Sequence, residues 1–235
     1  MRGRLAAAAY LATLAVVSGC AGDGDEGRGS GGQKQLAGAP LFGGSLEAAK
    51  RYQTRAFQPA LSFMVHDADW MASKAESRTL LILHGDRGRP GSHEPPKLLF
   101  VAFQRFTRVY DPDRPGDGRA STEPAPRDFV AWLRRHPDLS AGRASPARVG
   151  GLRGQKLDAR LTTGEPRHSP SKCTEPCVAL APDATFPRGL KVRFIVLGGK
   201  EPPLVATVEA PPRAFARFSA RAKRVLDSVR FARAQ

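Results

Sequence analysis

The chain has 235 residues, a formal net charge of +15 and three cysteines. Its length suits one domain with a sizeable core, and so basic a chain would attract anionic lipid, anionic wall polymer or nucleic acid. No basic stretch carries the interleaved aromatic residues of a nucleic-acid stacking platform, so we expect no nucleic-acid partner. Arginine far outnumbers lysine, and alanine, glycine and proline are abundant. The same charge could therefore reflect a high-GC composition bias.

The first 19 residues have the three zones of a secretory signal. Arg2 and Arg4 precede an apolar run over 5–17, and Ser18 and Gly19 follow it. The run is about 13 residues long, whereas a membrane-spanning helix needs about 20. The sequence therefore predicts a signal peptide over 1–19 and no permanent transmembrane helix.

The signal ends at a cysteine. Residues 17–20, Val-Ser-Gly-Cys, resemble the lipobox of bacterial lipoproteins: an aliphatic residue, two small residues and then cysteine. The resemblance implies that Cys20 receives a diacylglyceryl group, becomes the first residue of the mature chain and anchors it at the extracytoplasmic face of the cell membrane. Two acyl chains hold a protein stably on a bilayer, whereas one does not. The alternative is an ordinary secreted protein with an unpaired cysteine.

Residues 20–45 are predicted to be the lipidated cysteine and a flexible tether, because 21–39 are rich in glycine and charge. A single domain is predicted over 46–235. Its first strand is expected at 61–65, where apolar residues alternate, and buried strands are expected at 79–85 and 97–103. The composition of 111–126 predicts a long loop.

A short amphipathic helix is predicted within 126–137, because Phe129, Trp132 and Leu133 share one face. Trp132, like Trp70, is expected in the core rather than at a ligand. Gly150 and Gly151 then predict a hairpin.

Cys173 and Cys177 form an even pair of cysteines in an oxidising compartment. They predict a local disulfide. A zinc site would need further ligands, and a redox site is more usually Cys-x-x-Cys, so we expect neither.

Two further strands are predicted at 190–199 and 203–210, followed by a long C-terminal helix. The helix carries one apolar stripe, which comprises Phe215, Phe218, Ala222, Val225, Leu226 and Val229. Four arginines lie off the stripe: Arg213, Arg217, Arg221 and Arg224. They form either a solvated helix face or a surface for anionic headgroups.

The element order predicts an α+β fold, a mainly antiparallel sheet packed with a short central helix and a long C-terminal helix. The segments FQPALSFMV, PRDFVAWLRRHPDL, ARVGGLRGQKLDARL and VLDSVRF resemble a group of actinobacterial lipoproteins. More distantly they are similar to the PsbP/Mog1-like fold of the LpqN-type lipoproteins. The resemblance implies an antiparallel sheet between helices and transfers no catalytic residue.

No hydrolase, phosphate-loop, dinucleotide or metal motif is present, so we predict no cofactor, no metal and no enzymatic activity. The predicted function is a membrane-anchored binding or accessory module of the cell envelope. Its partner would be an anionic envelope component, another protein or a small apolar ligand. The alternative is a secreted envelope enzyme whose site is built from scattered residues.

Overall fold

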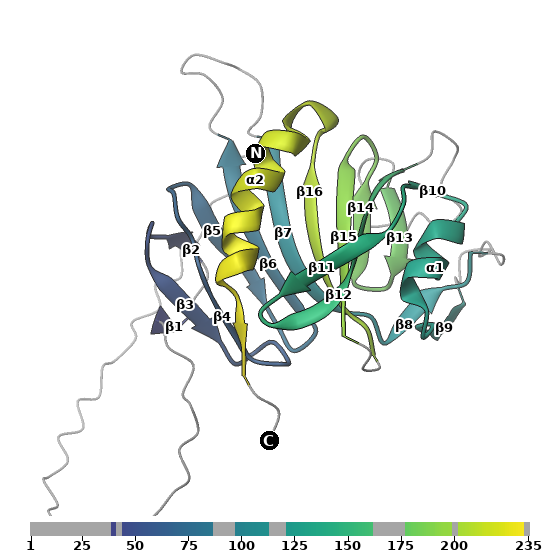
Figure 1. Ribbon diagram of the computed structural model, residues 1–235, viewed down its shortest axis with the longest axis horizontal. Coiled ribbons are helices and arrows are strands. Elements are labelled where there is room, and N and C mark those ends of the chain that lie inside the picture. Colours follow the sequence, from purple (N-terminus) through teal and green to yellow (C-terminus); the bar gives the residue numbers. More distant parts are fainter. Residues whose placement is uncertain are drawn as a thin grey trace, which may run out of the picture. The chain divides into compact units, whose positions relative to one another are not determined.

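The fold was determined as a computed structural model that describes residues 39–40, 44–86, 97–112, 121–161, 177–198 and 202–232 (Figure 1). The chain divides into a unit over 1–33 and a unit over 34–235. All described residues belong to the second unit.

Nine strands of the described residues form the main sheet. The order is β10-β12-β15-β16-β7-β6-β5-β2, with β11 paired to β12, and every pairing is antiparallel. The strands are β2 (Gly44–Leu46), β5 (Trp70–Ala75), β6 (Thr79–Asp86), β7 (Lys97–Arg105), β10 (Leu139–Ala141), β11 (Ser145–Val149), β12 (Leu152–Leu161), β15 (Lys191–Leu197) and β16 (Leu204–Ala210).

Three smaller sheets complete the β-structure of the described residues. One has the order β1-β3-β4-β17, in which only the β1–β3 pairing is parallel. The others are the pairs β8–β9 and β13–β14. Their bounds are β1 (Ala39–Pro40), β3 (Arg51–Thr54), β4 (Leu61–Met64), β8 (Arg108–Tyr110), β9 (Thr122–Pro124), β13 (Cys177–Ala181), β14 (Ala184–Pro187) and β17 (Arg230–Phe231).

Both predicted helices are present. Helix α1 (Phe129–Arg135) begins after Asp128, whose Oδ1 accepts a hydrogen bond from the Ala131 amide at 2.9 Å. The predicted start near Pro126 was early, because this cap places the first turn at Phe129. Helix α2 (Pro212–Ser228) has proline at its first position, and its predicted apolar stripe is buried through to the C-cap residue Val229.

The main sheet separates two hydrophobic clusters. On one face, which we call the α2 face, helix α2 and strand β4 pack against apolar side chains from β6, β7 and β16. The opposite face packs with α1, β13 and β14 around Phe186 and Phe194, whose ring centroids are 5.4 Å apart. All seven residues of β16 are buried, as expected for a strand covered on both faces.

Two glycine positions explain the β11–β12 hairpin. Gly150 and Gly151 have φ angles of +57° and +84°, which a type I′ turn requires at both central positions. Further along β12, a Cβ atom on Gly154 would lie 2.0 Å from the backbone oxygen of Val196. The close approach of β15 therefore excludes any side chain at Gly154.

The α+β class and the mainly antiparallel sheet agree with the sequence prediction, but local elements differ. Strand β1 and the first two residues of β2 lie within the range predicted as tether, and β2 is held in the sheet because Leu46, the first residue of the predicted domain, is buried opposite Trp70. The predicted loop over 111–126 includes β9, which pairs with β8. The β13–β14 pair was not predicted.

Candidate anion-binding surface

The four predicted arginines of α2 lie in two different environments. Arg213 and Arg217 are exposed near the start of the helix. Arg224 Nη2 lies 2.9 Å from Asp67 Oδ2, and Arg221 Nε lies 3.7 Å from the same oxygen. Arg221 and Arg224 therefore already face a carboxylate. The sequence did not reveal this contact, because Asp67 lies more than 150 residues away along the chain.

Asp67 joins the helix to the start of β5. Its Oδ1 accepts a hydrogen bond from Trp70 Nε1 at 2.5 Å, and Trp70 is buried against His84 with ring centroids 4.8 Å apart. Arg221 Nη1 lies 3.1 Å from His84 Nε2. These contacts fasten α2 to the sheet, so this half of the arginine row has a structural role.

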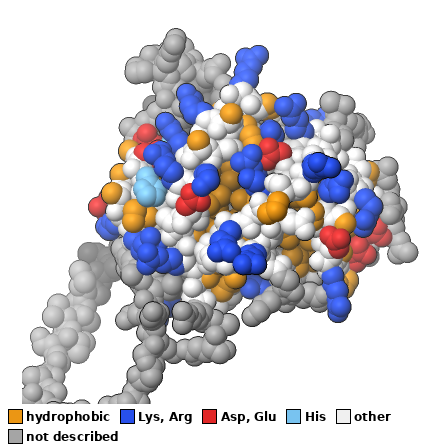
Figure 2. Space-filling model, in the orientation of Figure 1, with side chains coloured by type: hydrophobic (Ala, Val, Ile, Leu, Met, Phe, Trp, Pro, Cys, Tyr) orange, Lys and Arg blue, Asp and Glu red, His pale blue; other side chains and the backbone are white. Residues whose placement is uncertain are grey.

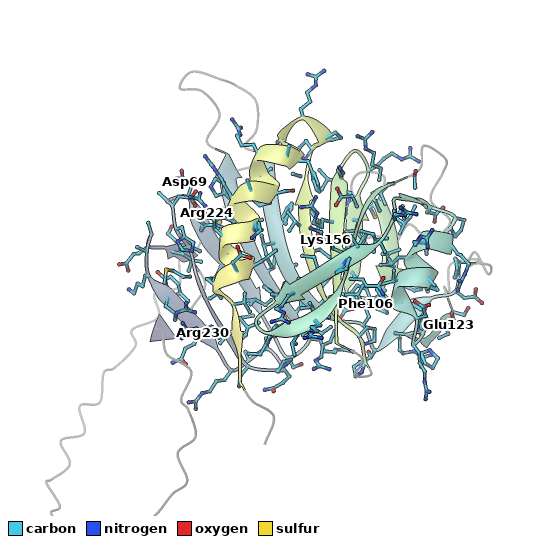
Figure 3. All side chains as sticks on the ribbon, in the orientation of Figure 1. Asp69, Phe106, Glu123, Lys156, Arg224 and Arg230 are labelled. Carbon is cyan, nitrogen blue, oxygen red and sulfur yellow. The ribbon has the colours of Figure 1, made fainter. Side chains whose placement is uncertain are left out.

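A second basic cluster lies on β12 and β15, on the α2 face. We call it the β12–β15 patch; it comprises Lys156, Arg160, Lys191 and Arg193 around Asp158. The pairing places Asp158 opposite Arg193 and Arg160 opposite Lys191. Residues two apart on a strand share a face and lie about 6.8 Å apart, so four cations surround one carboxylate. Lys156 is labelled on this face in Figure 3.

Asp158 holds two of these cations in place. Its Oδ1 lies 2.7 Å from Arg193 Nε, its Oδ2 lies 3.1 Å from Arg193 Nη2, and Lys191 Nζ lies 2.9 Å from Oδ2. Burial alone would raise the pKa of Asp158, but hydrogen bonds and charge from Arg193 and Lys191 outweigh burial and lower that pKa. The carboxylate therefore stays ionised and orders both cations.

The ring of Phe215 on α2 supports the same two side chains. Lys191 Nζ lies 4.4 Å from the ring centroid, and Arg193 Cζ lies 5.4 Å from it, both within the range of cation–π attraction. Lys191 and Arg193 nevertheless keep 26% and 27% of their side-chain surface exposed. They are ordered by the fold and still face solvent.

Lys156 and Arg160 differ from that pair because both are exposed. Neither makes an ion pair with another residue of the described ranges. With Asp158 satisfied by Lys191 and Arg193, the patch carries a surplus of positive charge. Figure 2 shows basic side chains spread over this face of the molecule, with acidic side chains at few places.

The opposite face of the sheet contains a buried carboxyl group. Glu209 on β16 is 7% exposed, and its Oε1 accepts a hydrogen bond from Thr207 Oγ1 at 2.8 Å. Burial raises the pKa of Glu209 to about 7, and the Thr207 hydrogen bond only partly offsets this. Its neighbours in register are Val192 and Phe100, so this carboxyl is flanked by apolar side chains on both adjacent strands.

Two of the other predicted sites lie outside the described residues: the lipid-attachment residue Cys20 and the disulfide partner Cys173. Cys177 is buried at the start of β13. In the described ranges, no group of three or more histidine, cysteine, aspartate or glutamate residues is placed to hold a metal ion. None of the helices described there is both long enough and apolar enough to cross a bilayer.

The patch was missed at the sequence level, although the signal is visible in retrospect. KLDAR and KVR place charges at every second residue between apolar ones, which puts them on one side of a strand. Only the β12–β15 register shows that the two sets are neighbours.

Comparison with solved structures shows a weak structural likeness. The crystal structure of LpqN, which is involved in cell envelope biogenesis of Mycobacterium tuberculosis, matches with a TM-score of 0.34 and 14% sequence identity. The match covers 82% of this chain and 91% of LpqN. A likeness this weak carries no argument about the present chain. No protein-family model matches the chain, and no curated protein matches it.

Proposed function

We propose that this protein is a lipid-anchored, non-catalytic binding module of the cell envelope, which holds an anionic envelope component through the β12–β15 patch. The observation that carries the proposal is the arrangement of four cations around Asp158, two ordered and two exposed. Positive charge concentrated on one rigid surface attracts anionic partners over distances of about 10 Å at moderate salt.

The anchor belongs to the proposal because the leader and the lipobox-like residues 17–20 support it. Cys20 would carry the diacylglyceryl group and hold the domain at the extracytoplasmic face of the membrane. We also infer the PsbP/Mog1-like arrangement, which the α+β class and the helix placed against an antiparallel sheet support. Mass spectrometry of the mature protein tests the anchor: the expected product begins at an acylated Cys20, and an unmodified Cys20 would contradict it.

A binding role agrees better with the site geometry than an enzymatic role does. Catalysis by acid–base chemistry needs at least two polar groups that converge on one point. The strongly shifted carboxyl, Glu209, has apolar neighbours on both adjacent strands and a single hydroxyl partner, Thr207. The β12–β15 patch offers cations but no nucleophile or base, since Asp158 is engaged by Lys191 and Arg193.

The test uses the chain from residue 20 onward with Cys20→Ser, which removes acylation and leaves the unit over 34–235 intact. This protein is mixed with isolated bacterial envelopes and sedimented at increasing salt. We expect retention at low salt that falls as the salt concentration rises. Absence of retention on any envelope fraction would overturn the binding role.

A matched pair of variants assigns the binding to the patch. Lys156→Gln with Arg160→Gln removes two exposed cations from the α2 face of β12. Arg148→Gln with Arg153→Gln removes two exposed cations from the same hairpin, on its opposite side. The protein with the first two substitutions should no longer be retained on the envelopes, whereas the protein with the second two should keep most of its retention.

A further inference from the structure

The contacts within the β12–β15 patch indicate what kind of anion it can bind. A guanidinium group recognises a single phosphate or carboxylate best through two parallel N–H donors. Arg193 already gives Nε and Nη2 to Asp158, and Lys191 gives Nζ to the same carboxylate. Lys191 and Arg193 therefore contribute positive charge to the patch, but Arg193 has no pair of parallel N–H donors left to bind a single anion.

The exposed half of the patch is spread out. Lys156 and Arg160 lie on the same side of β12, four residues and thus about 14 Å apart along the strand. Their long side chains can each reach a different anionic group. Separate charges at this spacing suit a surface that carries many anions better than they suit one small anion.

The proposed anchor supplies such a surface nearby. The 19 peptide units from Cys20 to Ala39 span at most about 65 Å, even when fully extended. A tether of this length gives a linked site a millimolar effective concentration. Weak contacts are then sufficient, because each basic residue close to an anionic leaflet strengthens binding about fivefold.

We propose that the β12–β15 patch docks on the anionic lipid headgroups of the membrane that carries the anchor, so that the α2 face of the sheet lies toward the bilayer. This inference rests on the proposed function, and it identifies the anionic envelope component as the lipid surface itself. The acyl group then determines residence at the membrane, and the patch determines the orientation of the domain. The opposite face, with α1 and β13–β14, is presented away from the membrane.

The test uses the same chain from residue 20 with Cys20→Ser, so that binding depends on the protein surface alone. Its partition is measured on vesicles of equal parts phosphatidylglycerol and phosphatidylcholine, and on vesicles of phosphatidylcholine alone. We expect binding to the anionic vesicles only. Lys156→Gln with Arg160→Gln should weaken it about 25-fold, and the Arg148→Gln, Arg153→Gln control should change it much less. Inorganic phosphate, added at constant ionic strength, should not compete.

Three results would overturn the inference in distinguishable ways. Specific competition by inorganic phosphate would show a site for a discrete anion. Retention on envelopes without binding to anionic vesicles would show a partner other than lipid, and the proposed binding function would stand. Equal weakening by both pairs of substitutions would show attraction by overall charge, with no role for the patch. Circular dichroism of each variant controls for misfolding.

Discussion

Glu209 makes the stability of this protein depend on pH in an unusual direction. The carboxyl group is buried in β16 and flanked by Val192 and Phe100, and its pKa in the folded state is about 7 against an ordinary value of 4.5. The folded protein therefore binds the proton more tightly than the unfolded chain does. The contribution of the protonated group is fully present below pH 4.5 and is lost as the pH rises to about 7.

The size of the effect follows from the difference between the two pKa values. Each unit corresponds to 1.36 kcal/mol, so the ionisation of Glu209 should cost about 3 kcal/mol of unfolding free energy at pH 8 relative to pH 4. Glu209→Gln removes the ionisation and keeps an oxygen that can accept the Thr207 hydrogen bond. The unfolding free energy of the variant, minus that of the natural protein, should therefore increase by about 3 kcal/mol between pH 4 and pH 8.

Urea denaturation at several pH values measures this difference directly, because the other titrating groups are common to both proteins. Thr207→Val provides the matched perturbation: it removes the hydrogen bond that lowers the pKa of Glu209. The pKa of Glu209 should be higher in this variant. Its unfolding free energy should therefore keep falling at pH values where that of the natural protein no longer changes because of Glu209. Parallel curves for the natural protein and Glu209→Gln would refute the reasoning, and so would an unfolding free energy of the variant, minus that of the natural protein, that decreases as the pH rises.

Three further predictions concern the local contacts. Gly154→Ala should lower the unfolding free energy measured in urea by more than about 2 kcal/mol, because the new Cβ atom would clash with the backbone of Val196. Gly151→Asn is the control and should cost less, because no atom lies close to a Cβ at that position. Asp67→Asn should cost about 1 to 2 kcal/mol, and a loss that is unchanged at high salt would contradict the role of its arginine partners. If Cys173 and Cys177 form a disulfide, alkylation of the denatured protein without reduction should leave both unmodified, and Cys177→Ser should cost about 2 kcal/mol.

The elements that the sequence predicted well carry a long, uninterrupted hydrophobic pattern. The stripe of α2 extends over four turns, and the strands β6, β7, β15 and β16 are apolar runs bounded by polar or glycine residues. The β13–β14 pair was missed because its two strands are short and alanine-containing, and a proline and an aspartate at the turn separate them, although β13 is fully buried. Here tertiary packing, rather than local propensity, determines the strand.

The functional surface was harder to predict, because its members are neighbours only through strand register. Asp158 and Arg193 are 35 residues apart in sequence. Their pairing depends on which strands meet and on which residues oppose one another, and a shift of one residue would turn every side chain to the other face. The charge pattern of α2 was visible in the sequence, but its carboxylate partner Asp67, in the connection between β4 and β5, was not.

The difference between the two basic regions is decided by their acidic neighbours. On α2, Asp67 lies against Arg221 and Arg224 and also against Trp70, so those cations hold the helix to the sheet. On β12 and β15, Asp158 engages two cations and leaves two more exposed beside them. A net charge of +15 therefore does not identify a binding surface by itself. A binding surface needs cations that the fold brings together and that the local carboxylate does not neutralise, and strand register places such cations side by side in the β12–β15 patch.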